Sequence, residues 1–194
     1  MVKATKDNRP FSSGVFDLEE FNIYTKVIDL PLDGIPTYLE EGINGVCTGG
    51  SALFNVFSNK RRVVKNDLIT IFPYQLASIT EISTDFAVIF FKVPKKLFMD
   101  TINGLGRLTL DYFFYMRKYY SSPLSEEEYK RFVHFCHILS CRVDLSCAFL
   151  RRESVMYLLR VYYWDLYVGY KSNPKAMALS LIHISEPTRH SLIS

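Results

Sequence analysis

The sequence predicts an α+β fold in which a β-rich first part is followed by a helical second part. Between residues 21 and 94, short runs rich in Val, Ile, Phe and Thr recur roughly every ten residues and are separated by turn residues. After Pro94 the apolar residues recur in steps of three and four, which is the period of an amphipathic helix. The regular spacing of the strands favours a sandwich or a barrel over alternating βαβ units.

Turn signals mark the boundaries of the expected strands. Gly49-Gly50, Asn66-Asp67 and the segment 83–85 are combinations typical of tight turns. The run 86–91 is apolar at every position, so we expect a strand that is covered on both faces. The expected strands span 21–30, 45–48, 52–57, 62–64, 68–72, 76–82 and 86–93.

Helices are expected at 95–102, at 107–120, from residue 125 onward and at 144–170. Ser125 followed by Glu128 matches the capping box that begins many helices. The last helix carries two neighbouring apolar stripes, which is more than one buried face requires. Met156, Tyr163 and Tyr167 form one stripe, which we expect to pack on the domain itself. The other is the candidate dimer interface: Val155, Leu159, Tyr162 and Leu166.

Composition and charge indicate a globular protein without a membrane segment. Hydrophobic residues make up 48% of the chain, but no apolar run approaches the ~20 residues that a membrane helix needs. The first residues lack the apolar core of a signal peptide, and the four cysteines suit a reducing compartment, so we expect a cytoplasmic protein. Residues 1–90 carry 8 Lys/Arg against 11 Asp/Glu, and residues 91–178 carry 14 against 8. The basic second part is more typical of a solvated helical surface than of an anionic partner.

The last sixteen residues, 179–194, form a segment apart. Leu179 to Arg189 matches, residue for residue, the conceptual translation of a transposase-type sequencing adapter, and residues 190–194 fit a sample index and the flanking primer. We therefore interpret 179–194 as a non-native tail and expect the natural sequence to diverge after Ala178. Residues 1–20 are expected to form an N-terminal arm.

Three segments of the β-rich part carry a family resemblance. Gly45-Val-Cys-Thr-Gly-Gly-Ser, Lys65-Asn-Asp-Leu-Ile-Thr-Ile-Phe-Pro and Ile82-Ser-Thr-Asp-Phe resemble the N-terminal sensory domain of AraC/XylS-type transcriptional regulators. The resemblance covers about residues 20–170. At position 66, Asn stands where the family often has Gly, a change that an Asn-Asp turn tolerates.

The resemblance implies a cupin-like β-barrel of the jelly-roll type over 21–94 and a helical dimerisation region over 95–178. It also implies a C-terminal DNA-binding domain with two helix-turn-helix motifs, which is missing from this chain. The expected function is effector sensing and dimerisation, with a second copy and a small-molecule effector as partners, and with DNA bound only through the missing domain. The alternative is a stand-alone cupin-like small-molecule-binding protein without DNA binding. Candidate ligand-binding residues, chosen for aromatic or polarisable side chains, are Tyr38, Cys47, Phe54, Phe72 and Tyr74; ordinary core packing is the alternative for each.

Residue types argue against an enzyme. Metal-dependent cupin enzymes resemble one another in using barrel histidines as ligands, and the segment 21–94 contains no histidine. His134, His137 and Cys141 share a helical face, but without a C-x-x-C pair neither a metal nor another cofactor is expected. Signatures of serine hydrolases and phosphate-binding loops are absent from the sequence, and no catalytic residue is assigned. The aromatic group around Trp164 suits helix packing better than stacking on single-stranded nucleic acid.

Overall fold

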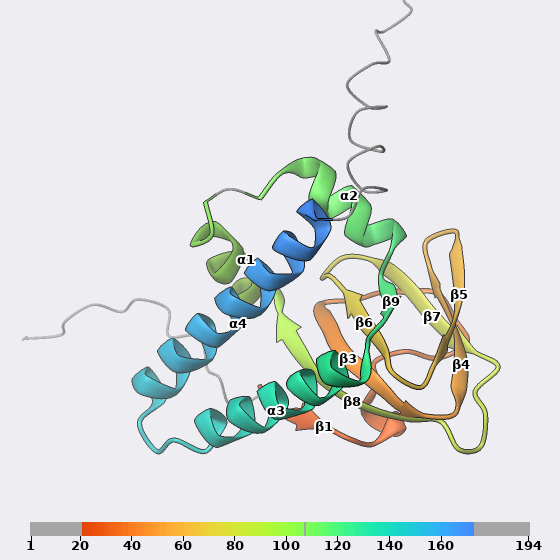
Figure 1. Cartoon of the computed structure of the whole chain (residues 1–194), viewed down its shortest axis with the longest axis horizontal. Helices are drawn as coiled ribbons and strands as arrows, with labels where there is room; N and C mark the ends of the chain where they lie inside the picture. Colours follow the sequence, from red (N-terminus) through yellow and green to blue (C-terminus); the bar gives the residue numbers. More distant parts are fainter. Residues whose placement is uncertain (1–20, 107, 173–194) are drawn as a thin grey trace, which may run out of the picture.

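The computed structural model describes residues 21–106 and 108–172, which form two stacked antiparallel sheets with helices on one side (Figure 1). The predicted α+β class is confirmed. The predicted barrel is not closed in the described residues, because their strands pair into two separate sheets, as in the sandwich that the strand spacing also allowed. One reason is visible at an edge strand, where Lys60, Arg61 and Arg62 are exposed, since charged side chains on an edge disfavour further pairing. The predicted arm at 1–20 and the tail at 179–194 lie outside the described residues.

The first sheet has five strands and the second has four, and every pairing is antiparallel. In spatial order, the first contains β1 (Ile23–Tyr24), β8 (Ala87–Pro94), β3 (Glu41–Gly49), β6 (Asp67–Ile71) and β9 (Ser121–Pro123). The second contains β2 (Thr37–Tyr38), β7 (Leu76–Thr80), β4 (Ser51–Val56) and β5 (Asn59–Val64).

The expected first strand at 21–30 is wrong beyond two residues. Only Ile23–Tyr24 pairs with β8, and a 3-10 turn, η2 (Val27–Asp29), follows. Strands β2 and β9 were not expected, because segments of two or three residues are too short to display an alternating pattern.

Gly50 turns the chain from the first sheet into the second. Its φ is +61°, and a Cβ there would lie 2.5 Å from the backbone nitrogen of Phe86, so the position requires glycine. The next residue joins this turn to a distant one, because the Ser51 N–H donates to Ser83 Oγ at 2.8 Å and the Ser83 N–H donates to the Ser51 carbonyl at 2.9 Å. Two of the three segments that carry the family resemblance therefore pack against each other.

The remaining segment with the family resemblance, residues 65–73, begins at the turn between β5 and β6. Asn66 adopts φ +71°, a left-handed conformation that Asn tolerates better than most residues, so the turn expected at Asn66-Asp67 is confirmed. Its N–H donates to the Cys47 carbonyl at 2.9 Å, while Asp67 Oδ2 accepts a hydrogen bond from the Val64 N–H at 3.0 Å. The first bond ties the turn to the end of β3, and the second closes the turn itself.

Two apolar cores share the first sheet. One lies between the sheets, and the other lies between the first sheet and the helices. On β8, Phe90 belongs to the core between the sheets and Phe91 to the core under the helices, which confirms the prediction of a strand covered on both faces.

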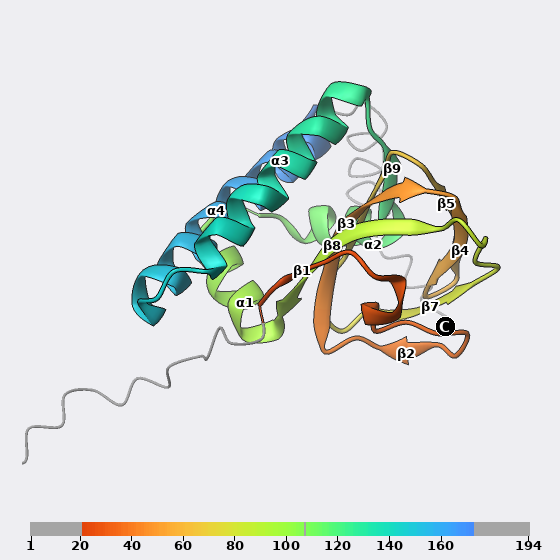
Figure 2. The ribbon, with the colours of Figure 1, turned by 90° about the horizontal axis from the view of Figure 1, so that it is seen from below.

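The helices are α1 (Lys95–Asn103), α2 (Leu110–Lys118), α3 (Glu126–Val143) and α4 (Ala148–Lys171), and α3 and α4 lie side by side (Figure 2). The capping box is confirmed, since Ser125 Oγ accepts from the Glu128 N–H and Glu128 Oε2 accepts from the Ser125 N–H. The long helix begins at Ala148 and not at 144, because Cys147 still has an extended backbone. None of the helices that the structure describes is long and apolar enough to cross a membrane.

Candidate ligand-binding cleft

The five candidate ligand residues fall into three different environments. Cys47 and Phe54 are fully buried in the core between the sheets. Burial raises the pKa of the Cys47 thiol, which donates a hydrogen bond to the Gly49 carbonyl at 3.1 Å. Tyr38 is exposed on the edge strand β2. Phe72 and Tyr74 line one cleft, so only these two of the five are brought together at a surface.

This aromatic cleft has a volume of about 400 Å³ and lies between the β6–β7 turn, α1 and α2. Small-molecule sites are commonly apolar hollows of roughly 300–1,000 Å³ with few polar groups. The cleft is lined by Phe57, Phe72, Pro73, Tyr74, Gln75, Lys95, Phe98, Met99, Phe113, Phe114 and Arg117.

Two of its aromatic residues hold unusual backbone conformations. Phe57 has φ +53° and Tyr74 has φ +63°, a region that bulky L-residues rarely adopt. The Tyr74 turn is fixed by hydrogen bonds, since its N–H donates to the Leu39 carbonyl at 2.7 Å and the Phe72 N–H donates to Gln75 Oε1 at 3.2 Å. Strain of this kind persists where the surrounding structure enforces it, and it is frequent at ligand sites.

Two cations lie over aromatic rings of the cleft. Lys95 Nζ is 4.6 Å from the centroid of the Tyr74 ring, and Arg117 Cζ is 3.4 Å from that of Phe57. Among the described residues that line the cleft, none is acidic. The hollow therefore combines an apolar floor with a positive rim. No local pattern in the sequence indicates Phe57, Lys95 and Arg117, because three separate segments bring them together.

The floor of the aromatic cleft contacts α4. The ring of Phe98 meets that of Tyr163 edge-on, with centroids 5.5 Å apart, and Phe72 lies 6.1 Å from the same ring. The Tyr163 hydroxyl accepts a hydrogen bond from the side-chain amide of Asn44 at 3.2 Å. Burial raises the pKa of Tyr163 well above its ordinary value, so the phenol is neutral.

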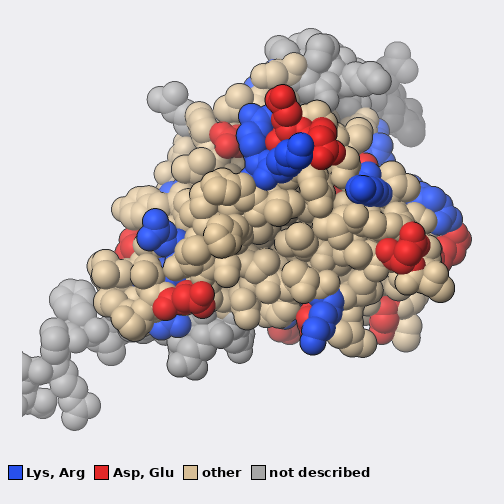
Figure 3. Space-filling model, turned by 60° about the horizontal axis from the view of Figure 1, so that its bottom comes forward, with Lys and Arg blue, Asp and Glu red and all other residues tan. Residues whose placement is uncertain are grey.

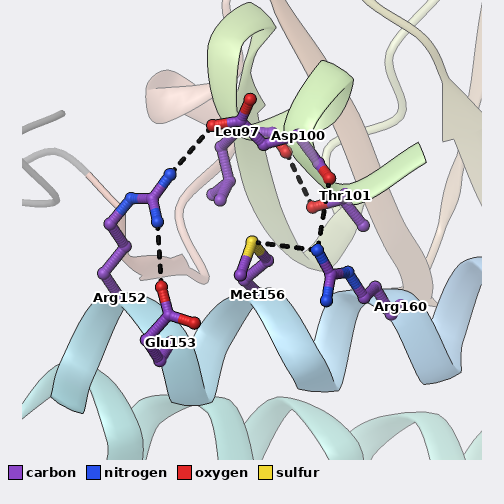
Figure 4. Close-up of polar contacts among 7 residues, drawn as sticks. All are labelled: Leu97, Asp100, Thr101, Arg152, Glu153, Met156 and Arg160. Carbon is purple, nitrogen blue, oxygen red and sulfur yellow. Dashed lines mark hydrogen bonds and ion pairs between the residues drawn. The ribbon is translucent and has the colours of Figure 1, made fainter. Parts of the chain in front are cut away.

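Polar contacts also join α1, one wall of the cleft, to α4 (Figure 4). Arg152 Nη2 lies 2.8 Å from Asp100 Oδ2, and Arg152 Nη1 lies 2.9 Å from Glu153 Oε1. About two turns further along α4, Arg160 Nη2 donates to the Asp100 carbonyl at 3.5 Å. The cleft and α4 are therefore connected both through rings and through charged side chains.

A larger groove of about 860 Å³ lies among β9, α2, α3 and α4. Its lining includes Phe132, Phe135 and Tyr162, and its charged residues have both signs, including Arg131 and Asp165. Figure 3 shows a face that is mostly uncharged, with acidic and basic side chains intermixed toward its edges. On this face there is no broad field of one sign.

The predicted dimer interface lies largely inside the protomer. Val155, Leu159 and Tyr162 are buried in the core under the helices, and Leu166 packs against it. A side chain buried within its own chain has little surface left for a partner, so the apolar surface available on α4 differs from the one predicted. Apart from Phe149 near the start of the helix, it consists of Leu150, Tyr157, Val161, Trp164 and Val168, which are 39–59% exposed and form the outer face of α4.

The polar clusters singled out in the sequence remain apart from the cleft. The rings of His134 and His137 have centroids 6.5 Å apart on α3, and Cys141 is exposed. Across 21–106 and 108–172, no group of three or more His, Cys, Asp or Glu side chains is placed to hold a metal ion.

Two solved structures overlap with part of this chain. Apo ToxT from Vibrio cholerae is 10% identical, with a TM-score of 0.48 over 81% of this chain and 55% of that chain. The AraC-like transcriptional activator CuxR is also 10% identical, with a TM-score of 0.34 over 72% of this chain and 46% of that one. The chain thus spans about half the length of each. No family model and no curated protein matches the sequence.

Proposed function

We propose that this chain is the effector-sensing and dimerisation module of an AraC/XylS-type transcriptional regulator, with a cupin-like β-domain. The module binds a small molecule, pairs with a second copy and has no catalytic role of its own. DNA recognition belongs to a helix-turn-helix domain C-terminal to it, as the family resemblance implies. Such a domain places side chains against base edges in the major groove.

The position of α4 carries this proposal. Its buried side contacts the floor of the aromatic cleft through Tyr163, while its outer face presents apolar side chains to solvent. One rigid element thus touches both a candidate effector site and a candidate dimer surface. A ligand that changes the packing of Phe72 or Phe98 therefore acts directly on the helix that carries that surface.

The outer face has the spacing of a helix–helix seam. Leu150, Tyr157, Val161, Trp164 and Val168 are separated by seven, four, three and four residues, as in a heptad pattern. The stripe extends over roughly 27 Å at 1.5 Å per residue. Contiguous exposed apolar side chains at this spacing are better covered by a partner helix than by water, and a second copy supplies an identical one.

Light scattering coupled to size exclusion tests the dimer on the full chain. Val161→Glu and Val168→Glu place a carboxylate in the seam, so we expect the dimeric wild type to become monomeric at the same concentration. Ile82→Glu is the matched control, because Ile82 and Val168 are both 46% exposed and Ile82 lies outside α4. A monomeric wild type, or equal dissociation by Ile82→Glu, contradicts the seam.

DNA binding tests the regulatory part. We expect this chain to bind DNA weakly, without sequence preference, and to release it as salt rises. The natural reading frame continued past codon 178 should encode two helix-turn-helix motifs and bind an operator specifically. A reading frame without them favours the stand-alone small-molecule-binding protein.

A further inference from the structure

We propose that the aromatic cleft binds an aromatic carboxylate, with its ring on the apolar floor and its carboxylate between Arg117 and Lys95. The effector role of such a ligand rests on the proposed sensory function, whereas its binding can be measured independently. Tyr38, Cys47 and Phe54 do not line this site: Cys47 and Phe54 are buried in the core between the sheets, and Tyr38 lies on the edge strand β2.

The apolar surface of the cleft is open to solvent. Tyr74 is 51% exposed, Phe114 is 59% exposed and Met99 is 46% exposed, and all three lie around the same hollow. Scattered exposed apolar residues are ordinary, but several around one concave site mark a surface that gains from being covered. A ligand with an apolar body would remove these side chains from water.

The walls favour a planar ring. Phe72 lies in the floor, and its ring meets that of Phe98 at 41° and that of Phe113 at 63°. Tilted and edge-on arrangements like these are the favourable geometry for aromatic contacts. A ligand ring entering from the Tyr74 side can extend the same packing, whereas an alkyl chain gains only from the area that it buries.

The rim favours an anion. Lys95 and Arg117 lie at the cleft, and their contacts in the structure are with the rings of Tyr74 and Phe57. A carboxylate can accept charge-assisted hydrogen bonds from both, and the planar guanidinium of Arg117 suits it in particular. The polar group deeper in the cleft, Gln75, uses its side-chain oxygen on the Phe72 N–H. Charge recognition is thus confined to the rim.

Calorimetric titration of the full chain with 2-naphthoate, 2-naphthamide and octanoate tests this assignment. We expect 2-naphthoate to bind at least about ten-fold more tightly than the neutral amide, which lacks the charge-assisted bonds. Octanoate should bind more weakly than 2-naphthoate, because it lacks the ring. Arg117→Gln should weaken 2-naphthoate by about ten-fold and leave the amide unchanged.

Two further variants make the result specific. Lys118→Gln is the control for charge, because Lys118 follows Arg117 on α2 but does not line the cleft. It should leave the affinity for 2-naphthoate unchanged. Phe114→Ala removes an exposed wall and should weaken the acid and the amide alike, with little effect on thermal stability.

Equal binding of acid and amide overturns the assignment, as does an equal loss in Lys118→Gln and Arg117→Gln. Tighter binding of octanoate than of 2-naphthoate replaces the aromatic class by an aliphatic one and also overturns it. If 2-naphthoate fails to bind while Val161→Glu still dissociates the dimer, the ligand class falls and the dimerisation function stands. If 2-naphthoate binds as expected to a chain that is always monomeric, the reverse holds.

Discussion

Asn44 and Tyr163 form a buried hydrogen bond of 3.2 Å between residues 119 positions apart, joining β3 to α4. On β6, Asn44 faces Thr70 across the strands. The Thr70 hydroxyl oxygen lies 3.2 Å from the Tyr162 hydroxyl oxygen. Neighbouring tyrosines of one helix therefore bond to a pair of residues that face each other in the sheet. This arrangement fixes both the rotation of α4 and its position along the sheet.

Tyr163→Phe tests how much this contact stabilises the domain. The substitution keeps the ring but leaves the Asn44 amide buried without its partner, which costs about 1–3 kcal/mol. We expect the melting temperature to fall by roughly 2–4 °C for each kcal/mol lost. Tyr157→Phe is the control, because Tyr157 lies on the same helix and is 59% exposed. Equal melting temperatures for both variants and the wild type would show that the bond contributes nothing.

Buried phenols predict a loss of stability at alkaline pH. The hydroxyl of Tyr120 donates to the carbonyls of Phe54 and Asn59 at 2.9 and 3.0 Å, and burial raises its pKa to about 12. In the unfolded chain the pKa is about 10. Between these values the unfolded state releases a proton that the folded state retains, so the free energy of unfolding falls as pH rises. The stabilisation is complete below about pH 10 and is lost as pH rises through the folded pKa.

Urea titrations at a series of pH values from neutral to alkaline measure this effect. Tyr120→Phe should reduce the decline in the free energy of unfolding with pH, although it also lowers the stability at neutral pH by removing both hydrogen bonds. Tyr162 and Tyr163, whose pKa values burial raises in the same direction, should leave part of the decline in place. An unchanged slope in the variant would contradict the role of Tyr120.

Gly45→Ala tests the close approach of β3 to β8. A Cβ at Gly45 would lie 2.5 Å from Phe90 Cβ and 2.7 Å from the Ile89 carbonyl oxygen, so the strands would have to separate. We expect a loss of about 1–3 kcal/mol or more, typical of overpacking in a core. Gly34→Ala is the matched control, because no heavy atom beyond its own residue and its two chain neighbours lies within 4 Å of its Cβ position. A melting temperature in Gly45→Ala equal to that of the control would contradict the contact.

Local signals predicted much of the fold. The capping box at Ser125 and the Asn66 turn depend on neighbouring residues, and the structure confirms both. No local signal shows which distant strands pair, so the sequence could not distinguish a closed barrel from two separate sheets. The buried face of α4 was also ambiguous, because apolar residues surround much of the helix and the selecting partners, Asn44 and Thr70, lie far away in the sequence.

In the candidate site, too, residue types could be identified from the sequence, but contacts between distant residues could not. Phe72 and Tyr74 were candidates because of their aromatic side chains alone, and they do lie in one cleft. Their type could not distinguish them from Phe54, which is equally aromatic but fully buried. The cations Lys95 and Arg117 belong to two helices and meet the cleft only through tertiary packing, so no local pattern in the sequence indicated them.

The link between α1 and α4 should depend on salt. Arg152 and Asp100 are 2.8 Å apart, but their side chains are 26% and 36% exposed, so water and ions screen the attraction. Asp100→Asn should lower the free energy of unfolding by about 0.2–1 kcal/mol in dilute buffer, and by less in about 1 M salt. Glu153→Gln removes the other carboxylate bound by Arg152 but leaves α1 joined to α4, so its effect on the packing of α1 should be smaller. Thermal melts of both variants at low and high salt distinguish the contribution of the Asp100–Arg152 ion pair from that of the Glu153–Arg152 ion pair. If Asp100→Asn destabilises the domain equally at both salt concentrations, the contact acts through packing and not through charge.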